Sequence, residues 1–189
     1  MFALVIFVII AIVVVGGGIS LYNRLVAIKH RVSTAWSNID VLLKQRHDEL
    51  PKLVETCKQY MTYEQETLER VMKARSAVHA ASGSQDPAAL GKAEGELRGQ
   101  LGKLFALAEA YPDLKANASF QQLQARISGL ETAIADRREL YNEAVNVNNA
   151  SIEQFPASVI AGLFTFKPAK LLEFAVAERA DVDVKALFS

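Results

Sequence analysis

The chain has few of the residues from which chemical sites are built. Among its 189 residues there is one cysteine, Cys57, and there are three histidines. A single cysteine excludes an intrachain disulfide framework. His30, His47 and His79 do not stand at the spacing of a helical metal site, and we expect each on a different helix or helix face. The sequence therefore predicts no metal ion and no cofactor.

The chain also has no excess of charge of one sign. Lys and Arg together number 21, Asp and Glu together number 21, and no long block of like charge occurs. A nucleic-acid-binding protein would carry a basic patch, so we expect no nucleic-acid partner. Neither a G-x-S-x-G motif nor a phosphate-binding glycine loop is found. We therefore expect no enzymatic activity, and we interpret Cys57 as a small buried apolar residue.

The first 23 residues have no charged side chain, and Arg24 is the first. Between Phe2 and Leu21 stand 14 Phe, Leu, Ile and Val residues. A helix of this length covers the ~30 Å hydrocarbon core of a bilayer, and these residues favour insertion by roughly 4 to 8 kcal/mol. Residues 1–23 are predicted to be a transmembrane anchor.

The alternative for this segment is a cleaved signal peptide, but no Lys or Arg precedes the apolar run and no clear cleavage pattern follows it. Arg24, Lys29 and Arg31 stand directly after the span. The positive-inside rule then puts the N-terminus outside and the rest of the chain in the cytoplasm.

Helical periodicity continues beyond the anchor. From Leu21 to Leu42 apolar residues recur at alternating spacings of four and three. We expect an all-α fold, in which the transmembrane helix continues into an antiparallel up-down four-helix bundle with coiled-coil-like packing. The bundle is expected over residues 24–154, with helices at about 21–47, 49–80, 87–111 and 119–154.

Local signals set these boundaries. Arg46 and Glu49 occupy positions where the first apolar seam requires apolar residues, and Pro51 follows. Because an interior proline costs about 3 kcal/mol, Asp48 is predicted to be the N-cap of the second helix. Asp86 followed by Pro87 predicts the start of the third helix. Ser119 begins a capping-box pattern for the fourth helix.

Glycines at positions 91, 95, 99 and 102 crowd the first half of the third helix. Each costs up to about 1 kcal/mol relative to alanine. Either another helix approaches closely there, or this is the least stable part of the bundle.

Two groups of residues are candidates for interaction. The first is a polar strip on the fourth helix, with Arg137, Arg138, Asn142, Asn146 and Asn149. The second belongs to residues 155–189, an irregular tail that contains five of the nine phenylalanines: Phe155, Phe164, Phe166, Phe174 and Phe188. If the helices alternate in direction, this tail lies at the membrane-proximal end. There it could cap the bundle, lie in the lipid interface or pack on a neighbouring protomer.

Five stretches of the chain resemble the signature stretches of the LemA family: residues 21–26, 36–41, 43–54, the segment Glu109-Ala-Tyr-Pro-Asp-Leu-Lys-Ala116, and residues 155–162. Cys57 stands where the family usually has valine. The resemblance implies a bacterial membrane protein with a short outer N-terminal segment, one span and an antiparallel helical domain. It implies no activity, cofactor or catalytic residue.

Three functional hypotheses follow. The first is a membrane-anchored helical scaffold that self-associates or binds other membrane proteins, since tethering concentrates weak contacts. The second is a membrane-bound regulatory binding module or hydrolase that uses the polar strip, chiefly Arg137, Arg138 and residues 142–149. The third is a lipid-interface sensor that acts through the tail, including Phe164 and Phe166.

Overall fold

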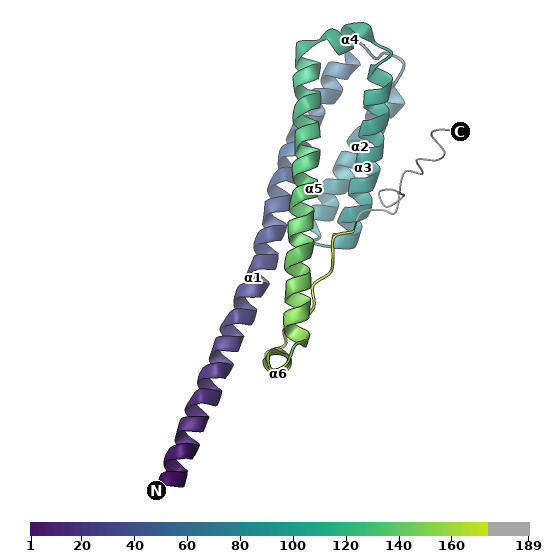
Figure 1. The fold of residues 1–189 in the computed structure, drawn as a ribbon. Helices are drawn as coiled ribbons and strands as arrows, with labels where there is room; N and C mark the ends of the chain where they lie inside the picture. The colour runs from purple at the N-terminus through teal and green to yellow at the C-terminus, as the bar shows by residue number, and fades with distance from the viewer. Residues whose placement is uncertain (174–189) are drawn as a thin grey trace, which may run out of the picture. The chain divides into compact units, whose positions relative to one another are not determined.

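The computed structural model describes residues 1–173. In this part of the chain all regular secondary structure is helical (Figure 1). The helices are α1 (Phe2–Lys58), α2 (Gln65–Gly83), α3 (Pro87–Ala108), α4 (Pro112–Ala116), α5 (Ala118–Glu153) and α6 (Ala157–Leu163). The predicted all-α fold is confirmed.

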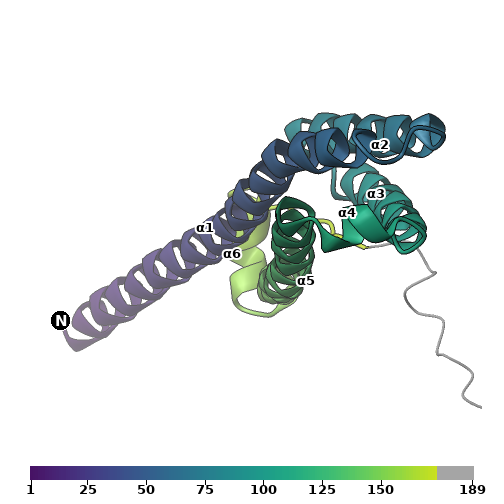
Figure 2. The same ribbon diagram turned by 90° about the horizontal axis from the view of Figure 1, so that it is seen from above.

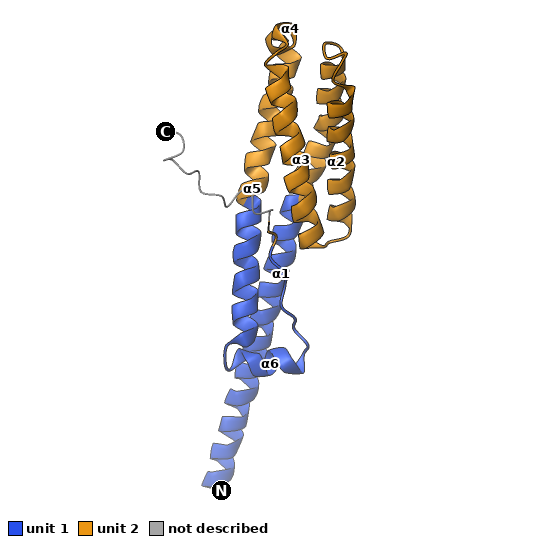
Figure 3. Ribbon diagram, turned by 90° about the vertical axis from the view of Figure 1, so that its right-hand side faces the viewer, with its two compact units in different colours: residues 1–39, 137–171 blue, residues 40–136, 172–189 orange. Residues whose placement is uncertain are grey.

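The described residues form two compact units (Figure 3). Unit 1 contains Met1–Ile39 and Arg137–Leu171, and unit 2 contains Asp40–Asp136 together with residues 172–173. Both α1 and α5 contribute to both units. The region expected as one bundle, residues 24–154, is thus divided between two units.

Unit 2 is an antiparallel bundle of the end of α1, α2, α3 and the beginning of α5, joined in up-down order. Helices α2 and α3 pack against each other, as the view from above shows (Figure 2). The core consists of side chains with almost no exposed surface: Leu50, Leu53, Leu68, Leu90, Leu97, Leu104, Leu114 and Ile127. The predicted up-down bundle is confirmed within this unit.

The helix boundary predicted at Asp48 is wrong, because α1 continues through Pro51 to Lys58. A proline has no N–H to donate to the carbonyl four residues earlier, which here belongs to His47. That carbonyl accepts a hydrogen bond of 2.8 Å from Nε of Arg75 on α2 instead. The chain turns at residues 59–64, so the reversal lies more than a helical turn beyond the predicted position.

Of the other two predicted helix starts, one is confirmed and one is not. The Asp86 side chain accepts a 3.2 Å hydrogen bond from the amide of Ala88, with Pro87 in the first turn, as predicted. At α5 the cap is not Ser119. Asn117 accepts a 3.0 Å hydrogen bond from the amide of Phe120, and the helix begins at Ala118.

The glycines of α3 also separate into two kinds. A Cβ atom on Gly91 would clash with the carbonyl oxygen of Glu173, whereas a Cβ on Gly99 or Gly102 would meet nothing within 4 Å. Close approach therefore explains Gly91, and the approaching segment is extended chain rather than a helix.

Unit 1 consists of the first part of α1, the end of α5, α6 and the segment that follows α6. The beginning of α1 is the one helical segment among residues 1–173 that is long and apolar enough to cross a membrane, and its most apolar stretch is entirely exposed. The tail expected to be irregular contains α6. Phe174 and Phe188, part of the same prediction, lie outside the described residues.

Candidate functional site

The polar strip of α5 binds residues 167–170 of the same chain within unit 1. Asn149 donates from Nδ2 to the carbonyl of Ala169 at 3.0 Å and accepts from the Ala169 amide at 2.9 Å. Asn148, which is buried, donates to the Lys167 carbonyl at 3.4 Å. The Tyr141 hydroxyl donates to the Lys170 carbonyl at 2.9 Å. These side chains form hydrogen bonds with the backbone of an extended segment, as the backbone of a neighbouring β-strand would.

The remaining strip residues are divided by exposure. Arg137 and Asn146 are exposed, whereas Arg138 and Asn142 are half-buried and engaged in contacts. The strip is therefore not one continuous free surface. Tyr141, which is not among the candidate residues, donates one of these hydrogen bonds, and Asn148 belongs to the range 142–149 of the second hypothesis.

The candidate residues Phe164 and Phe166 both lie against Tyr22 of α1. The ring centroids are 4.7 Å apart for Phe164 and 5.9 Å apart for Phe166. Farther along α1, Trp36 meets Tyr141 edge-on at 5.4 Å. Aromatic contacts of this kind stabilise by roughly 0.5–1.5 kcal/mol each beyond their buried area.

The charged cluster that lies deepest within unit 2 is centred on Arg46, which is 2% exposed. Its guanidinium donates to Glu94 of α3 and, at 2.7 Å, to Glu131 of α5. Burial raises the pKa of the Glu94 carboxyl, and the neighbouring Arg46 guanidinium partly offsets this shift. Arg98 lies 3.9 Å from Glu131 at the edge of the cluster.

The sequence carries a signal for this cluster, which the prediction of a helix boundary at Asp48 assigns to a helix end. Arg46 and Glu49 stand at core positions of α1, and the structure shows them buried and paired rather than at a helix end. Glu49 forms ion pairs with Arg126 and with Lys52, each at 3.2 Å. The cavity beside Arg46 measures about 20 Å³, which admits nothing larger than a water molecule. The cluster therefore joins helices and offers no room for a substrate.

His47 of α1 and His79 of α2 lie on different helices, as expected, but their rings are in contact. Their ring centroids lie 4.6 Å apart, and Nη2 of Arg75 is 2.6 Å from Nε2 of His47. Burial, helped by the charges of Arg75 and His79, holds the pKa of His47 below its ordinary value. A neutral His47 can accept the Arg75 hydrogen bond at Nε2. Residues 1–173 contain no group of three or more metal-ligating side chains.

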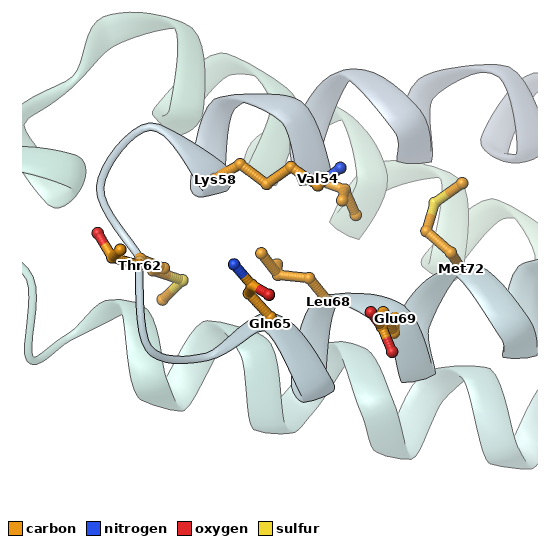
Figure 4. A pocket seen from close by; sticks show the side chains of 8 residues that line it. Val54, Lys58, Thr62, Gln65, Leu68, Glu69 and Met72 are labelled. Carbon is orange, nitrogen blue, oxygen red and sulfur yellow. The ribbon is translucent and has the colours of Figure 1, made fainter.

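An open groove of about 470 Å³ lies where α1 turns into α2 (Figure 4). Its floor is apolar, with Val54, Met61, Leu68 and Met72. Four polar residues also line the groove, one of them a cation and one an anion: Lys58, Thr62, Gln65 and Glu69. Methionine side chains adapt to irregular apolar partners. The groove has the volume and lining of a site for an apolar side chain or a short apolar segment.

Cys57 is fully buried in unit 2, as expected. Burial raises the pKa of its thiol to about 12. Since the thiolate is the reactive form, this cysteine is poorly suited to nucleophilic chemistry.

Comparison with known proteins places the chain in a family. A model of the LemA family matches residues 35–186. This match covers most of the chain, including the second half of α1 and all of α2 to α6. The chain belongs to the LemA family. The resemblance of its signature stretches is thereby confirmed.

Among its relatives is Protein LemA of Metamycoplasma hominis, which is 28% identical over 166 residues, or 87% of this chain and 74% of that protein. Magnetosome proteins MamQ 1 and MamQ 2 of Paramagnetospirillum magneticum are each 25% identical over 175 residues, covering 80% of this chain and 64% of theirs. This LemA-family chain therefore spans less than two thirds of the two magnetosome proteins.

Proposed function

We propose that this LemA-family chain is a membrane-anchored helical scaffold that self-associates and binds other membrane proteins at the bilayer surface. The observation that carries the proposal is the continuity of α1. One helix, Phe2–Lys58, contains an exposed apolar stretch of spanning length and also the first helix of the bundle in unit 2.

The exposure of the apolar stretch supports a membrane environment. Phe2, Phe7 and Ile12 are 88%, 71% and 66% exposed, and their neighbours on α1 are similar. Soluble proteins rarely expose apolar patches of more than a few hundred Å². In lipid this surface is stabilised, and it holds the bundle at the membrane.

The interior of unit 2 supports a binding role rather than catalysis. The carboxylates of Glu94 and Glu131 are both paired with Arg46, and the Cys57 thiol is buried with a raised pKa. The groove between α1 and α2 is the feature suited to a partner, because it is open and lined by apolar side chains, of which Met72 is partly exposed. Confinement to a membrane raises the local concentration of such weakly binding surfaces.

The polar-strip hypothesis loses support, since Asn149 and its neighbour Asn148 are occupied by the chain's own segment. We propose no catalytic role for Arg137 or Arg138.

Self-association is tested with the full-length chain, fluorescently tagged and extracted with its native lipids into nanodiscs. We expect most occupied discs to show two or more photobleaching steps, and Met72→Lys, which puts a charge on the groove floor, to shift the distribution toward one. Arg70→Ala on the exposed face of α2 is the matched control and should change nothing. A single step in nearly all wild-type discs would refute self-association.

The proposal also places the N-terminus outside the bacterial inner membrane and unit 2 in the cytoplasm, because Arg24, Lys29 and Arg31 follow the span. Tyr63 is 94% exposed at the turn between α1 and α2. In a Cys57→Ala background, Tyr63→Cys should resist a membrane-impermeant thiol reagent in intact cells and react after permeabilisation. Labelling in intact cells would reverse the orientation.

A further inference from the structure

Unit 1 has a second exposed apolar surface, on the segment that turns back after α5. We call residues Phe155–Phe166, which include α6, the elbow. Phe155 is 83% exposed, Leu163 is 73% exposed, and Val159 and Phe164 are more than half exposed. The turn thus presents large apolar side chains outward, although a water-facing turn would be expected to carry polar ones.

Contacts within unit 1 fix the position of the elbow along α1. A Cβ atom on Gly18 would lie 3.9 Å from Cδ1 of Ile160, which is an ordinary van der Waals distance. Phe164 and Phe166 lie against Tyr22. The elbow therefore lies beside residues 18–22, where the exposed apolar stretch of α1 ends. Gly18 precedes Arg24, the first charged residue, by about 9 Å of helix.

The charges of this region complement a membrane surface. Lys167, which directly follows the elbow, is exposed, and the acidic residue nearest to the elbow in sequence is Glu153 at the end of α5. Lys170 is exposed as well, but its carbonyl accepts from Tyr141 beside Trp36, farther along α1. Arg24 on α1 is exposed as well. Cations next to outward-facing phenylalanine and leucine are typical of segments that lie in the interface of anionic bilayers.

We propose that the elbow is an interfacial membrane contact of this chain. Phe155, Val159, Leu163 and Phe164 enter the boundary between lipid headgroups and acyl chains, and Lys167 meets anionic headgroups. The inference rests on the proposed function, because the depth of the elbow is set by an α1 that spans the bilayer. Lipid fits this surface better than a second copy does, since the apolar residues lie at the end of the span and are followed directly by Lys167.

The chain offers a direct test because it has one tryptophan, Trp36. Trp36 stands 18 residues after Gly18, about 27 Å farther along α1. The full-length chain is reconstituted into phosphatidylcholine and phosphatidylglycerol vesicles that carry bromine at either shallow or deep acyl positions. In a Trp36→Phe background, Leu163→Trp reports on the elbow and Ile9→Trp on the anchor. Leu140→Trp, an exposed position on α5, is the matched control.

We expect about twofold quenching of Leu163→Trp by shallow bromines and less by deep ones, because interfacial segments are buried by ~5–10 Å. Ile9→Trp should be quenched more by deep bromines. The fluorescence of Trp36 in the unsubstituted chain, and that of Leu140→Trp, should be quenched very little at either bromine position. Phe155→Trp, a conservative change at an exposed site, repeats the elbow measurement if Leu163→Trp alters the circular dichroism spectrum.

The outcomes separate the two proposals. If Ile9→Trp is quenched and neither elbow variant is, the interfacial contact is refuted and the anchor stands. If Ile9→Trp is not quenched by either bromine position, the anchor and the proposed function fail together. Quenching of Leu140→Trp as strong as that of Leu163→Trp would also overturn the inference, since the elbow would then have no special contact with lipid.

Discussion

Units 1 and 2 use the same two long helices in different ways. In unit 2, α1 and α5 bury leucines and isoleucines together with α2 and α3, and a buried arginine joins three helices through Glu94 and Glu131. In unit 1 the contact of Trp36 with Tyr141 joins α1 to α5, and asparagine side chains of α5 bind an extended segment. The apolar residues of unit 1 are largely exposed.

The two units are therefore suited to different surroundings. Unit 2 satisfies its apolar and charged groups internally, so its stability comes from its own core. Unit 1 leaves apolar surface exposed, and we propose that lipid covers it. Substitutions in unit 2 should therefore affect unfolding of the bundle, whereas substitutions in unit 1 should have local effects.

The largest effect is expected at Arg46. Arg46→Met leaves Glu94 buried without a partner, which costs about 3–5 kcal/mol of unfolding free energy. Urea unfolding of the full-length chain in nanodiscs, followed by circular dichroism, measures this loss. Glu94→Leu added to Arg46→Met should recover part of it, because the unpaired charge is then gone. Arg70→Ala, which breaks an exposed pair with Glu66, should cost about 0.5 kcal/mol or less. A loss at Arg46 no larger than this would contradict the assigned role of the cluster.

Gly91 gives the next effect. Gly91→Ala would force the backbone at Glu173 away from α3, at a cost of about 1–3 kcal/mol by overpacking. Gly102→Ala on the same helix meets open space and should stabilise by up to about 1 kcal/mol through helix propensity. The same urea experiment measures both variants. If both variants changed the unfolding free energy in the same direction, residue 173 would not contact α3 at Gly91.

Arg75 and Pro51 are expected to be coupled. Arg75→Ala leaves the His47 carbonyl without its donor and should cost about 1–3 kcal/mol. In a Pro51→Ala background the amide of residue 51 can donate to that carbonyl, so the cost of Arg75→Ala should fall by about 1 kcal/mol. A double-mutant cycle measures the difference. Equal costs in the two backgrounds would show that Arg75 does not compensate for the proline.

The smallest and most local effect belongs to unit 1. Asn149→Ala removes both hydrogen bonds to Ala169, and the exchange of the Ala169 amide with solvent should accelerate about tenfold, which corresponds to ~1.4 kcal/mol. The urea midpoint of unit 2 should not change. Asn146→Ala, at an exposed position of the same helix, should leave the exchange rate unaltered. A large loss of bundle stability on Asn149→Ala would remove the distinction between the units.

Local patterns in the sequence predicted much of the fold. The heptad spacing after Leu21 indicated the long first helix, and Asp86 with Pro87 marked the start of α3. Periodicity and caps succeed here because neighbouring residues determine them. The prediction at Asp48 failed because Pro51 is accommodated by Arg75, a residue 28 positions from His47 whose contact no local pattern encodes.

The candidate residues show the same limit. The pairing of Arg46 with Glu94 joins residues 48 positions apart. The polar strip was recognised from its composition, but its occupation by residues 167–170 depends on how the chain folds back after α5. A polar residue at a core position of an apolar seam, such as Arg46, is the signal that would have indicated a buried ion pair rather than a helix end.

The most direct test is a spin-label scan along α1 in the full-length chain, reconstituted into vesicles in a Cys57→Ala background. Labels are placed singly from Val5 to Glu55, and their accessibility to oxygen is compared with that to a water-soluble nickel complex. Our account predicts that oxygen dominates up to about Tyr22, that the balance reverses by Arg24, and that the nickel complex dominates at exposed positions such as Lys44 and Lys52. Nickel accessibility at Phe7 and Val13 equal to that at Lys44 would contradict the claim that one helix carries both the anchor and the bundle.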